Sequence, residues 1–252
     1  MTGVIIQARM SSSRLPGKAL MLLSGEAVLY HVVERTRRAR CADIIIVATT
    51  EEPEDDKVAA FCAKRGYVCF RGPRDNVLER YFEAARTWRL DTVVRVTSDC
   101  PLIDPAIIDL CVERFQTSEC DYMSNTAPGE RSFPRGLDVE VFTFVALERA
   151  DREAREPYER EHVTPYIHEN KKGEFRVGPM LVARGIYARP QYRLTLDYPE
   201  DYKLLKLLYG NFYRRGGIVA VSEVLAYLDE HPKVVALNAS REEGYPRAGI
   251  RK

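Results

Sequence analysis

The chain lacks any long apolar run. Nowhere in its 252 residues does an uninterrupted hydrophobic stretch approach the ~20 residues that a helix needs to cross a bilayer. Met1 is followed at once by residues typical of a strand, without the charged and apolar regions of a secretory signal. We therefore expect a cytoplasmic protein that is not inserted in a membrane.

Paired cysteines are also missing. The six cysteines form no CxxC pair, and none lies at zinc-ligand spacing from a histidine. Scattered thiols of this kind are typical of the reducing cytosol. The sequence thus indicates neither a structural zinc site nor a redox motif.

There is little excess charge of either sign. The 38 basic and 37 acidic side chains leave a net charge of +1, which argues against a nucleic-acid partner. The arginine-rich run at 34–41 follows Val28, Leu29, Val32 and Val33, which recur at helical spacing. We interpret these arginines as a solvated face of that helix.

Two familiar phosphate-binding loops are absent. Gly17 and Lys18 are followed by Ala19, with no glycine five residues earlier, so the GxxxxGK[ST] pattern is missing. No strand is followed by GxGxxG either. These absences exclude a P-loop NTPase and a typical dinucleotide-binding oxidoreductase.

What is present is a regular alternation of apolar strands and amphipathic helices. It predicts an α/β protein whose mostly parallel sheet carries helices on both faces. The expected strands are 3–8, 42–50, 67–72 and 91–99, and the helices between them are 26–40, 53–66 and 76–90. Further strands are expected at 120–125, 137–144 and 192–197, helices at 144–154, 159–171, 198–213 and 221–232, and a loose polar tail from 238. No linker interrupts the pattern, so we expect a single domain over 1–252.

A basic loop follows the first predicted strand. It contains Arg9, Arg14 and Lys18 among serines, a proline and a glycine. Guanidinium and ammonium donors, together with backbone N–H groups in a serine-rich turn, match a triphosphate better than a single carboxylate. The loop lies at the carboxyl end of a strand, where open α/β sheets bind ligands. The alternative is a solvated surface turn.

Two aspartates also follow predicted strands. Asp99 ends the segment VVRVTSD, and Asp197 precedes a helix that begins with proline. If they converge at one edge of the sheet, they can hold Mg²⁺ against phosphates. Taken singly, Asp99 is better explained as a turn residue, and a helix cap is an adequate explanation of Asp197. Asp104, which precedes Pro105, is expected to be an N-cap.

A third group of polar residues is a candidate sugar site. On an alternating strand Asp138 and Glu140 share one face, opposite the aliphatic side chains, and Arg135 precedes them. Glu161 and His162 lie in a later helical stretch. These side chains can hydrogen-bond sugar hydroxyls. Alternatively, the strand face is solvated and His162 is structural.

These motifs resemble those of the cytidylyltransferases that activate acidic sugars, such as 3-deoxy-manno-octulosonate and acylneuraminate. The branch that is most similar is that of spore coat polysaccharide biosynthesis protein F. The resemblance covers residues 3 to about 210. It rests on IIQARMSSSRLPGKAL, VTSDCPLIDP, GLDVEVF, REHVTPY and TLDYPEDYKLL. Gln7 stands where the sugar-acid enzymes have proline and Ser98 where many relatives have glycine; both fit the spore-coat branch.

The resemblance implies a fold and a set of roles. The fold is that of the nucleotide-diphospho-sugar transferases, a Rossmann-like three-layer αβα sandwich with a mostly parallel mixed sheet. A subregion around 120–190 is implied to bind the sugar and to form a homodimer. The nucleotide-binding residues implied are Ala8, Arg9, Arg14 and Lys18, the catalytic ones Arg14, Lys18 and Asp99, the Mg²⁺ ligands Asp99 and Asp197, and the sugar-binding residues Arg135, Asp138, Glu140, Glu161 and His162.

The implied reaction is transfer of CMP from CTP to an acidic sugar, with release of pyrophosphate, for surface polysaccharide biosynthesis. Two alternatives remain open. One is a glycosyltransferase of the same fold that consumes a nucleotide-sugar, although Asp99 is followed by Cys100 and Pro101 and not by the Asp-x-Asp motif common in that class. The other is a non-catalytic nucleotide-binding protein.

Overall fold

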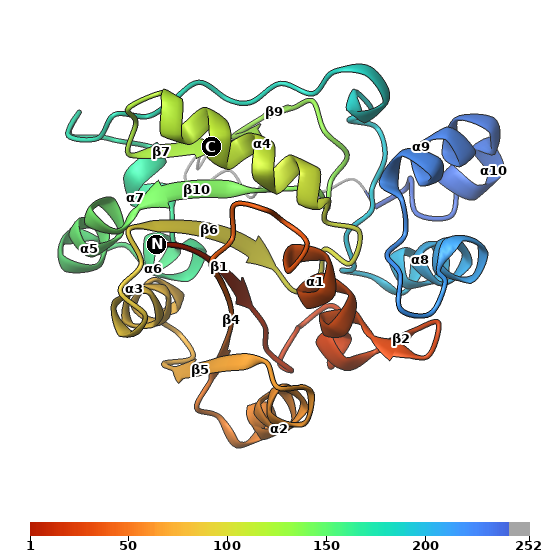
Figure 1. Cartoon of the computed structure of the whole chain (residues 1–252), viewed down its shortest axis with the longest axis horizontal. Helices are drawn as coiled ribbons and strands as arrows, with labels where there is room; N and C mark the ends of the chain where they lie inside the picture. Colours follow the sequence, from red (N-terminus) through yellow and green to blue (C-terminus); the bar gives the residue numbers. More distant parts are fainter. Residues whose placement is uncertain (242–252) are drawn as a thin grey trace, which may run out of the picture.

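A six-stranded mixed sheet forms the centre of the computed structural model, which describes residues 1–241 (Figure 1). The strands follow the order β5-β4-β1-β6-β10-β7. The first four run parallel, and β10 is antiparallel to both of its neighbours. Their bounds are β1 Thr2–Gln7, β4 Ile44–Thr50, β5 Val68–Gly72, β6 Thr92–Thr97, β7 Tyr122–Ser124 and β10 Glu140–Thr143.

Helices cover both faces of this sheet and make three layers (Figure 1). One face carries α1 Val28–Thr36, α2 Asp56–Arg65, α4 Pro105–Thr117, α8 Pro199–Phe212 and α9 Val221–Glu230. The other carries α3 Val77–Thr87, α5 Phe144–Glu153, α6 Pro157–His162 and α7 Pro165–His168. The remaining elements are α10 Pro232–Val235, the 3₁₀ turns η1 Lys18–Leu20, η2 Pro53–Asp55 and η3 Gly185–Tyr187, and two small hairpins, β2 Leu22–Leu23 with β3 Glu26–Ala27 and β8 Thr126–Ala127 with β9 Glu130–Arg131.

The sequence of β1 shows why it lies at the centre. Val4 and Ile6 belong to the apolar cluster on one face of the sheet and Ile5 to the cluster on the other. All three are fully buried. A strand whose side chains alternate between two apolar layers, without a polar face, is stable only when both faces are covered. The predicted α/β sandwich with a mostly parallel mixed sheet is confirmed.

The arginine-rich run is only partly the solvated face that the sequence predicts. Helix α1 ends at Thr36, and Arg37, Arg38 and Arg40 are exposed. Arg35, in contrast, is buried, and its Nη1 donates to the Val219 carbonyl at 2.6 Å. The interpretation is wrong for this residue because it falls on the packed stripe of α1, where backbone carbonyls replace water as acceptors.

The predicted strand at 192–197 is also wrong. This segment makes only an isolated bridge between Arg193 and Arg135. Beyond this bridge, the backbone N–H of Leu196 donates to the Asp99 carbonyl at 2.8 Å, and Asp99 lies in the loop after β6 and not in a strand. A Cβ on Gly136 would lie 2.6 Å from backbone atoms of Leu194, so only glycine lets the segment pass this close. Gly136 also has φ 99, which glycine adopts without strain.

The predicted helix at 159–171 is two short helices, α6 and α7. Val163 breaks it with φ 74 and ψ −55, and the Thr164 N–H donates to the His162 carbonyl at 2.9 Å. These values describe a strained γ-turn, rare for a β-branched residue.

Residues 242–252 of the predicted polar tail lie outside the described residues. Between residues 1 and 241, no helix is both long and apolar enough to cross a membrane.

Candidate active site

A polar cleft of about 370 Å³ lies where β1 and β6 end. These strands are neighbours in parallel, and Gln7 pairs with Thr97, so their carboxyl ends meet at one edge of the sheet. The cleft is lined by the loop after β1, the start of α3, the end of β6 and the end of α6. The lining residues are Gln7, Ala8, Arg9, Ser12, Ser13, Arg14, Lys18, Val77, Arg80, Thr97, Ser98, Asp99, Glu161 and His162.

The basic loop folds back on itself and so presents its cations to the cleft. The Gly17 N–H donates to the Met10 carbonyl at 2.8 Å, and Gly17 has φ 73, a conformation that favours glycine. The turn η1 begins directly afterwards at Lys18, and the next side chain, Ala19, is buried. The Met10 N–H donates to the Asp55 carboxylate at 2.6 Å, which fixes the other side of the loop.

Lys18 joins the two predicted metal-binding aspartates. Its Nζ lies 2.6 Å from Oδ2 of Asp99 and 2.8 Å from Oδ1 of Asp197. Side chains of all three are mostly buried, with 13% of Lys18, 21% of Asp99 and 9% of Asp197 exposed. The structure therefore brings Asp99 and Asp197 onto one point, as the metal-site hypothesis requires.

Each aspartate is oriented by further contacts. The Thr97 hydroxyl donates to Oδ1 of Asp99 at 2.5 Å, which leaves Oδ2 for Lys18. Asp197 accepts from Nη2 of Arg14 at 2.8 Å through Oδ1 and from Nη2 of Arg193 at 3.1 Å through Oδ2. One oxygen of Asp197 thus faces the cleft cations while the other is held from behind.

Behind the cleft, Arg193 and Asp201 form a buried ion pair. The guanidinium donates from Nε at 2.8 Å and from Nη2 at 3.0 Å to the two carboxylate oxygens of Asp201. Asp201 also accepts from the backbone N–H of Asp197 at 2.9 Å and from Asn238 at 2.8 Å. The sequence analysis missed Arg193, since it assigned this segment to a strand and local spacing does not reveal the pair.

The charges around Lys18 reinforce one another. Burial lowers the pKa of the Lys18 ammonium, but Asp99 and Asp197 more than offset this, so its pKa lies above the ordinary value. Burial also raises the pKa of the Asp197 carboxyl, yet Lys18 and Arg14 outweigh it and bring that pKa down to about 2. Both groups are therefore charged at neutral pH.

Arg80 is a second cleft residue that the sequence analysis missed. It is 1% exposed, and its Nη1 donates to the Pro73 carbonyl at 2.5 Å, which anchors the turn before α3. Burial and the nearby Arg9 lower its pKa. A signal was present, because Arg80 falls on the same helical stripe as Val77, Tyr81 and Ala84, where a charged side chain is unexpected.

The predicted sugar-binding residues are divided between two places. Glu161 and His162 line the cleft. Burial is the main cause that lowers the pKa of His162, so its imidazole is neutral at pH 7 and can both donate and accept a hydrogen bond. Arg135, Asp138 and Glu140 are not among the residues that line the cleft.

Asp138 and Glu140 each bind an arginine of the chain. Asp138 lies before β10, which begins at Glu140, and forms a two-point contact with Arg131. Glu140 pairs with Arg95 and accepts from the Tyr122 hydroxyl at 3.0 Å. Glu140 borders a separate cavity of about 140 Å³ with Tyr122 and His168 among its neighbours. Arg95 in turn reaches Oε1 of Gln7 at 3.3 Å, so the Glu140 pair contacts the floor of the cleft.

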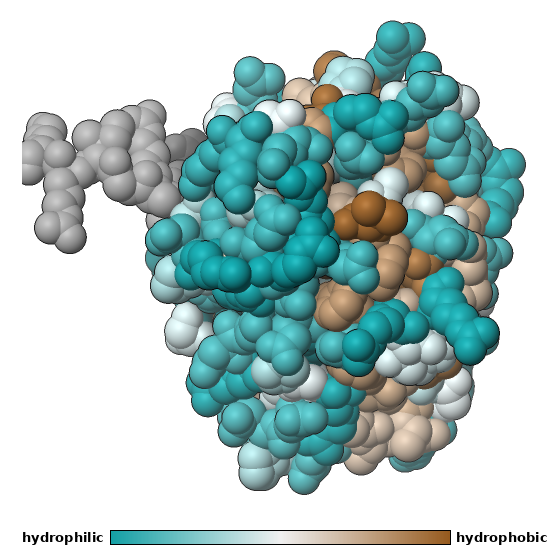
Figure 2. Space-filling model, turned by 90° about the vertical axis from the view of Figure 1, so that its left-hand side faces the viewer, coloured by the Kyte–Doolittle hydropathy of each residue, from teal (hydrophilic) through white to brown (hydrophobic). Residues whose placement is uncertain are grey.

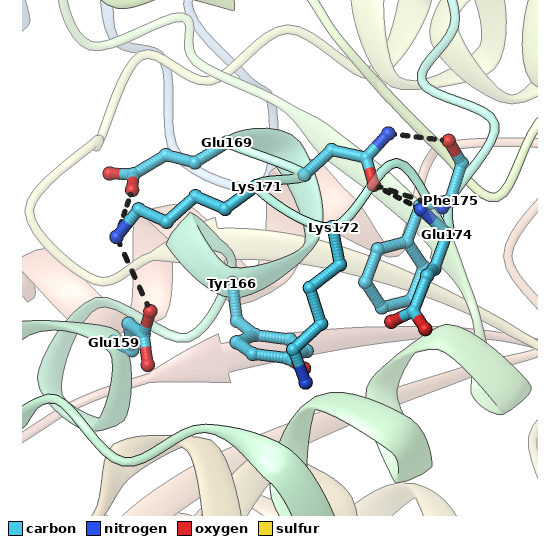
Figure 3. Close-up of a pocket in the computed structure, with 8 residues that line it drawn as sticks. Glu159, Tyr166, Glu169, Lys171, Lys172, Glu174 and Phe175 are labelled. Carbon is cyan, nitrogen blue, oxygen red and sulfur yellow. Dashed lines mark hydrogen bonds and ion pairs between the residues drawn. The ribbon is translucent and has the colours of Figure 1, made fainter.

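A further small cavity of about 90 Å³ lies between α7 and the segment after it (Figure 3). Its charged side chains contact one another: Lys171 lies 3.0 Å from Glu169 and 3.8 Å from Glu159. Lys172 lies 3.1 Å from the Tyr166 hydroxyl. These internal pairs do not resemble a binding site for a charged ligand, and we do not assign one there.

The donor set at Lys18 fits a divalent cation. Mg²⁺ is typically bound by one or two carboxylates together with water and substrate phosphates. Asp99 and Asp197 supply two carboxylates that already bracket one positive charge. No group of three or more His, Cys, Asp or Glu side chains suited to a metal occurs among residues 1–241. Two carboxylates leave the other positions around such a cation to water and substrate oxygens.

A comparison with protein families shows which family the chain belongs to. The family model for cytidylyltransferases matches residues 3–226. The chain belongs to the cytidylyltransferase family. The predicted family, and with it the prediction of an enzyme of this class, is thereby confirmed.

Individual relatives agree with this assignment. Spore coat polysaccharide biosynthesis protein SpsF of Bacillus subtilis is 35% identical over 90% of this chain and 94% of its own length. A 3-deoxy-manno-octulosonate cytidylyltransferase of Pelobacter propionicus is 39% identical over 43% of this chain and 42% of its own. The solved structure of a cytidylyltransferase from Leptospira borgpetersenii superposes with a TM-score of 0.84 at 34% identity, covering 97% of this chain and 98% of that one.

Proposed function

We propose that this cytidylyltransferase transfers CMP from CTP to a hydroxyl of an acidic sugar, with release of pyrophosphate, in the biosynthesis of a surface polysaccharide. The observation that carries the proposal is the Lys18 ammonium between Asp99 and Asp197 in a cleft that also holds Arg9 and Arg14. The similarity to a spore coat polysaccharide protein and, over part of the chain, to a 3-deoxy-manno-octulosonate enzyme supports the choice of sugar class.

The basic loop is suited to hold the triphosphate. Ala8, directly after β1, lines the cleft together with Arg9, Arg14 and Lys18. A sugar oxygen attacks the α-phosphorus in line and loses its proton, while the bond to the β-phosphate breaks and pyrophosphate leaves. Such a transfer depends on positioning and on stabilising the charge of the phosphates. Arg14 and Lys18 supply that charge for the leaving pyrophosphate.

We assign the divalent cation, Mg²⁺, to Asp99 and Asp197. When bound there, the cation neutralises negative charge on the phosphates. Thr97 orients Asp99, and Arg193 orients Asp197. The two carboxylates therefore keep defined directions toward the cleft.

For the acceptor sugar we propose Glu161 and His162 as hydrogen-bonding residues, since both line the cleft. Glu140, Asp138 and Arg135 remain predicted sugar-binding residues. Glu140 acts through Arg95 and Gln7, which connect it to the cleft floor. Asp138 forms an ion pair with Arg131, so it binds the sugar only if the acceptor molecule extends past that arginine.

We also infer a single domain over 1–252 that works in the cytoplasm as a homodimer. Its cysteines are all free, which fits a reducing compartment.

The region 120–190 carries the dimer contact in this proposal. Figure 2, seen from the side of α5 and β7, shows apolar side chains gathered among polar ones. The exposed Val145 comes from α5, and Val177 bridges to Tyr122 of the edge strand β7.

The test is calorimetric titration with CTP, UTP, ATP and GTP, each with and without Mg²⁺, followed by a pyrophosphate-release assay with acidic sugars. We expect Mg²⁺-dependent binding that is selective for CTP and is lost in Arg14→Ala. Arg86→Ala is the matched control, since Arg86 lies in the last turn of α3 and is 63% exposed. Failure to bind any triphosphate, with binding of a nucleotide-diphosphate sugar instead, would replace the proposal by a glycosyltransferase.

A further inference from the structure

The position between Asp99 and Asp197 is already held by a cation of the chain itself. We propose that this site takes a divalent cation only as a cation–triphosphate complex and not as the free ion, because Lys18 has to move from the two aspartates onto the triphosphate first. The inference rests on the proposed function, since it takes the cleft as a triphosphate site. It concerns the form in which the cation enters.

Geometry places the ammonium and a divalent cation in competition. Lys18 Nζ contacts one oxygen of each aspartate, at 2.6 and 2.8 Å. Mg²⁺ binds oxygens at 2.0–2.1 Å, so an ion bound to these same two oxygens would lie in direct contact with the ammonium. Two positive charges so close in a partly buried site repel strongly. Lys18 therefore has to leave before the ion can enter.

The aspartates of the surrounding cluster are already paired with cations of the chain. Among residues 1–241, Asp99, Asp197 and Asp201 lie within 3.1 Å of positive groups on Lys18, Arg14 and Arg193. A free divalent ion would add two positive charges beside these cations. A triphosphate brings several negative charges and many acceptor oxygens, which match the ammonium and guanidinium donors of Lys18 and Arg14. The triphosphate therefore supplies the negative charge and the acceptor oxygens that a free ion does not bring.

The chain is built so that Lys18 can move while the aspartates stay. Lys18 carries its charge on a flexible four-carbon stem, and the residue lines the cleft. Its backbone is fixed by the turn at Gly17 and by the buried Ala19. Asp197, on the other hand, is held from behind by Arg193 and its ion pair with Asp201. Only the lysine side chain has to change direction.

The experiment measures Mn²⁺ binding by electron paramagnetic resonance of the free ion, with and without CTP. The variants are Lys18→Met, which removes the charge at similar volume, and Lys64→Met, a control at an exposed lysine of α2. For the wild type and Lys64→Met we expect weak Mn²⁺ binding that CTP tightens by roughly tenfold or more. For Lys18→Met we expect tighter binding of Mn²⁺ alone, weaker binding of CTP, and a much smaller effect of CTP on Mn²⁺.

Two results would overturn the inference. One is wild-type protein that binds Mn²⁺ equally well with and without CTP, and the other is Lys18→Met with unchanged or weaker affinity for Mn²⁺ alone. Lys18→Gln serves as the second variant if the methionine protein does not fold. The titration of Lys18→Met with Mn²⁺ in the absence of nucleotide tests the inference without depending on the proposed function. If the wild type binds no CTP, the proposed function fails, whereas the competition between Lys18 and the ion is still measured.

Discussion

The backbone N–H of Leu196 donates to the carbonyl oxygen of Asp99 at 2.8 Å. This bond attaches the segment that precedes α8 to the turn that follows β6. The next residue along that segment is Asp197, so the two carboxylates come to lie on either side of Lys18. This contact, together with the bond from the Thr195 hydroxyl to the same carbonyl at 3.2 Å, joins the halves of the proposed cation site.

Asp99→Asn should abolish most of the activity without unfolding the protein. The amide keeps the size of the side chain but removes the charge that faces Lys18 and the proposed cation. We expect a loss of roughly a hundredfold or more in kcat, measured as pyrophosphate release, with an unchanged circular dichroism spectrum. Asp75→Asn, at a position whose side chain is 95% exposed, is the control. Near-normal turnover of Asp99→Asn would remove the metal role of this residue.

Gly136→Ala should displace the segment that carries Asp197. The added Cβ would lie 2.6 Å from backbone atoms of Leu194 and Thr195, which no side-chain movement can relieve. We expect a lower free energy of unfolding by about 2 kcal/mol or more, together with loss of activity. Gly129→Ala is the control, because Gly129 also has a positive φ of 79 but has open space around it. Equal effects of the two substitutions would show that backbone strain alone is responsible.

The ion pairs of Asp197 should appear as a pH dependence of stability in acid. Lys18 and Arg14 lower the pKa of this carboxyl to about 2, whereas an unfolded aspartate has a pKa of about 3.9. The contribution to stability is thus fully present above pH ~4 and is lost as the pH falls toward 2. Urea unfolding between pH 5 and 2 measures it. Asp197→Asn should show a shallower fall over this window, and parallel curves for the two proteins would contradict the assignment.

Arg35→Ala should destabilise the fold although the residue is charged and lies in an arginine-rich run. Its guanidinium donates to the Ile103 and Val219 carbonyls from a buried position. Removal leaves two buried acceptors and a gap beside α1, at a cost of about 2–4 kcal/mol in the free energy of unfolding. Arg37 directly follows the last residue of α1 and its side chain is half exposed, so Arg37→Ala should cost less than about 0.5 kcal/mol. Chemical denaturation of both variants compares them directly.

Val145→Lys should convert the proposed homodimer to a monomer. The Val145 side chain is 71% exposed at the start of α5. A lysine there would bury a charge in an interface. Light scattering after size-exclusion chromatography gives the mass. Leu22→Lys, in the β2 hairpin, is the control at a similarly exposed apolar residue. A monomeric wild type would disprove the dimer.

Local patterns were sufficient for much of the fold. The buried strands β1, β4 and β6 and the helix α3 follow from apolar periodicity, which reflects contacts made within each element and its layer. The N-cap role of Asp104 was predicted too, and its carboxylate accepts from the Ala106 N–H at 2.9 Å. Capping depends on neighbours in the sequence, so the sequence reveals it.

The basic loop and the two aspartate segments could be recognised from sequence, because residue types and their place after strands follow from chemistry and from the general design of α/β sheets. Which charges meet was decided by the tertiary structure alone. Arg193 holds Asp197, Glu140 pairs with Arg95, and Arg35 is buried on distant carbonyls. Except for the first, these contacts join segments far apart in the chain, and the first depends on a loop that is neither helix nor strand. Periodicity reports only which side of an element is buried, and the partner of a buried charge is set by packing between elements.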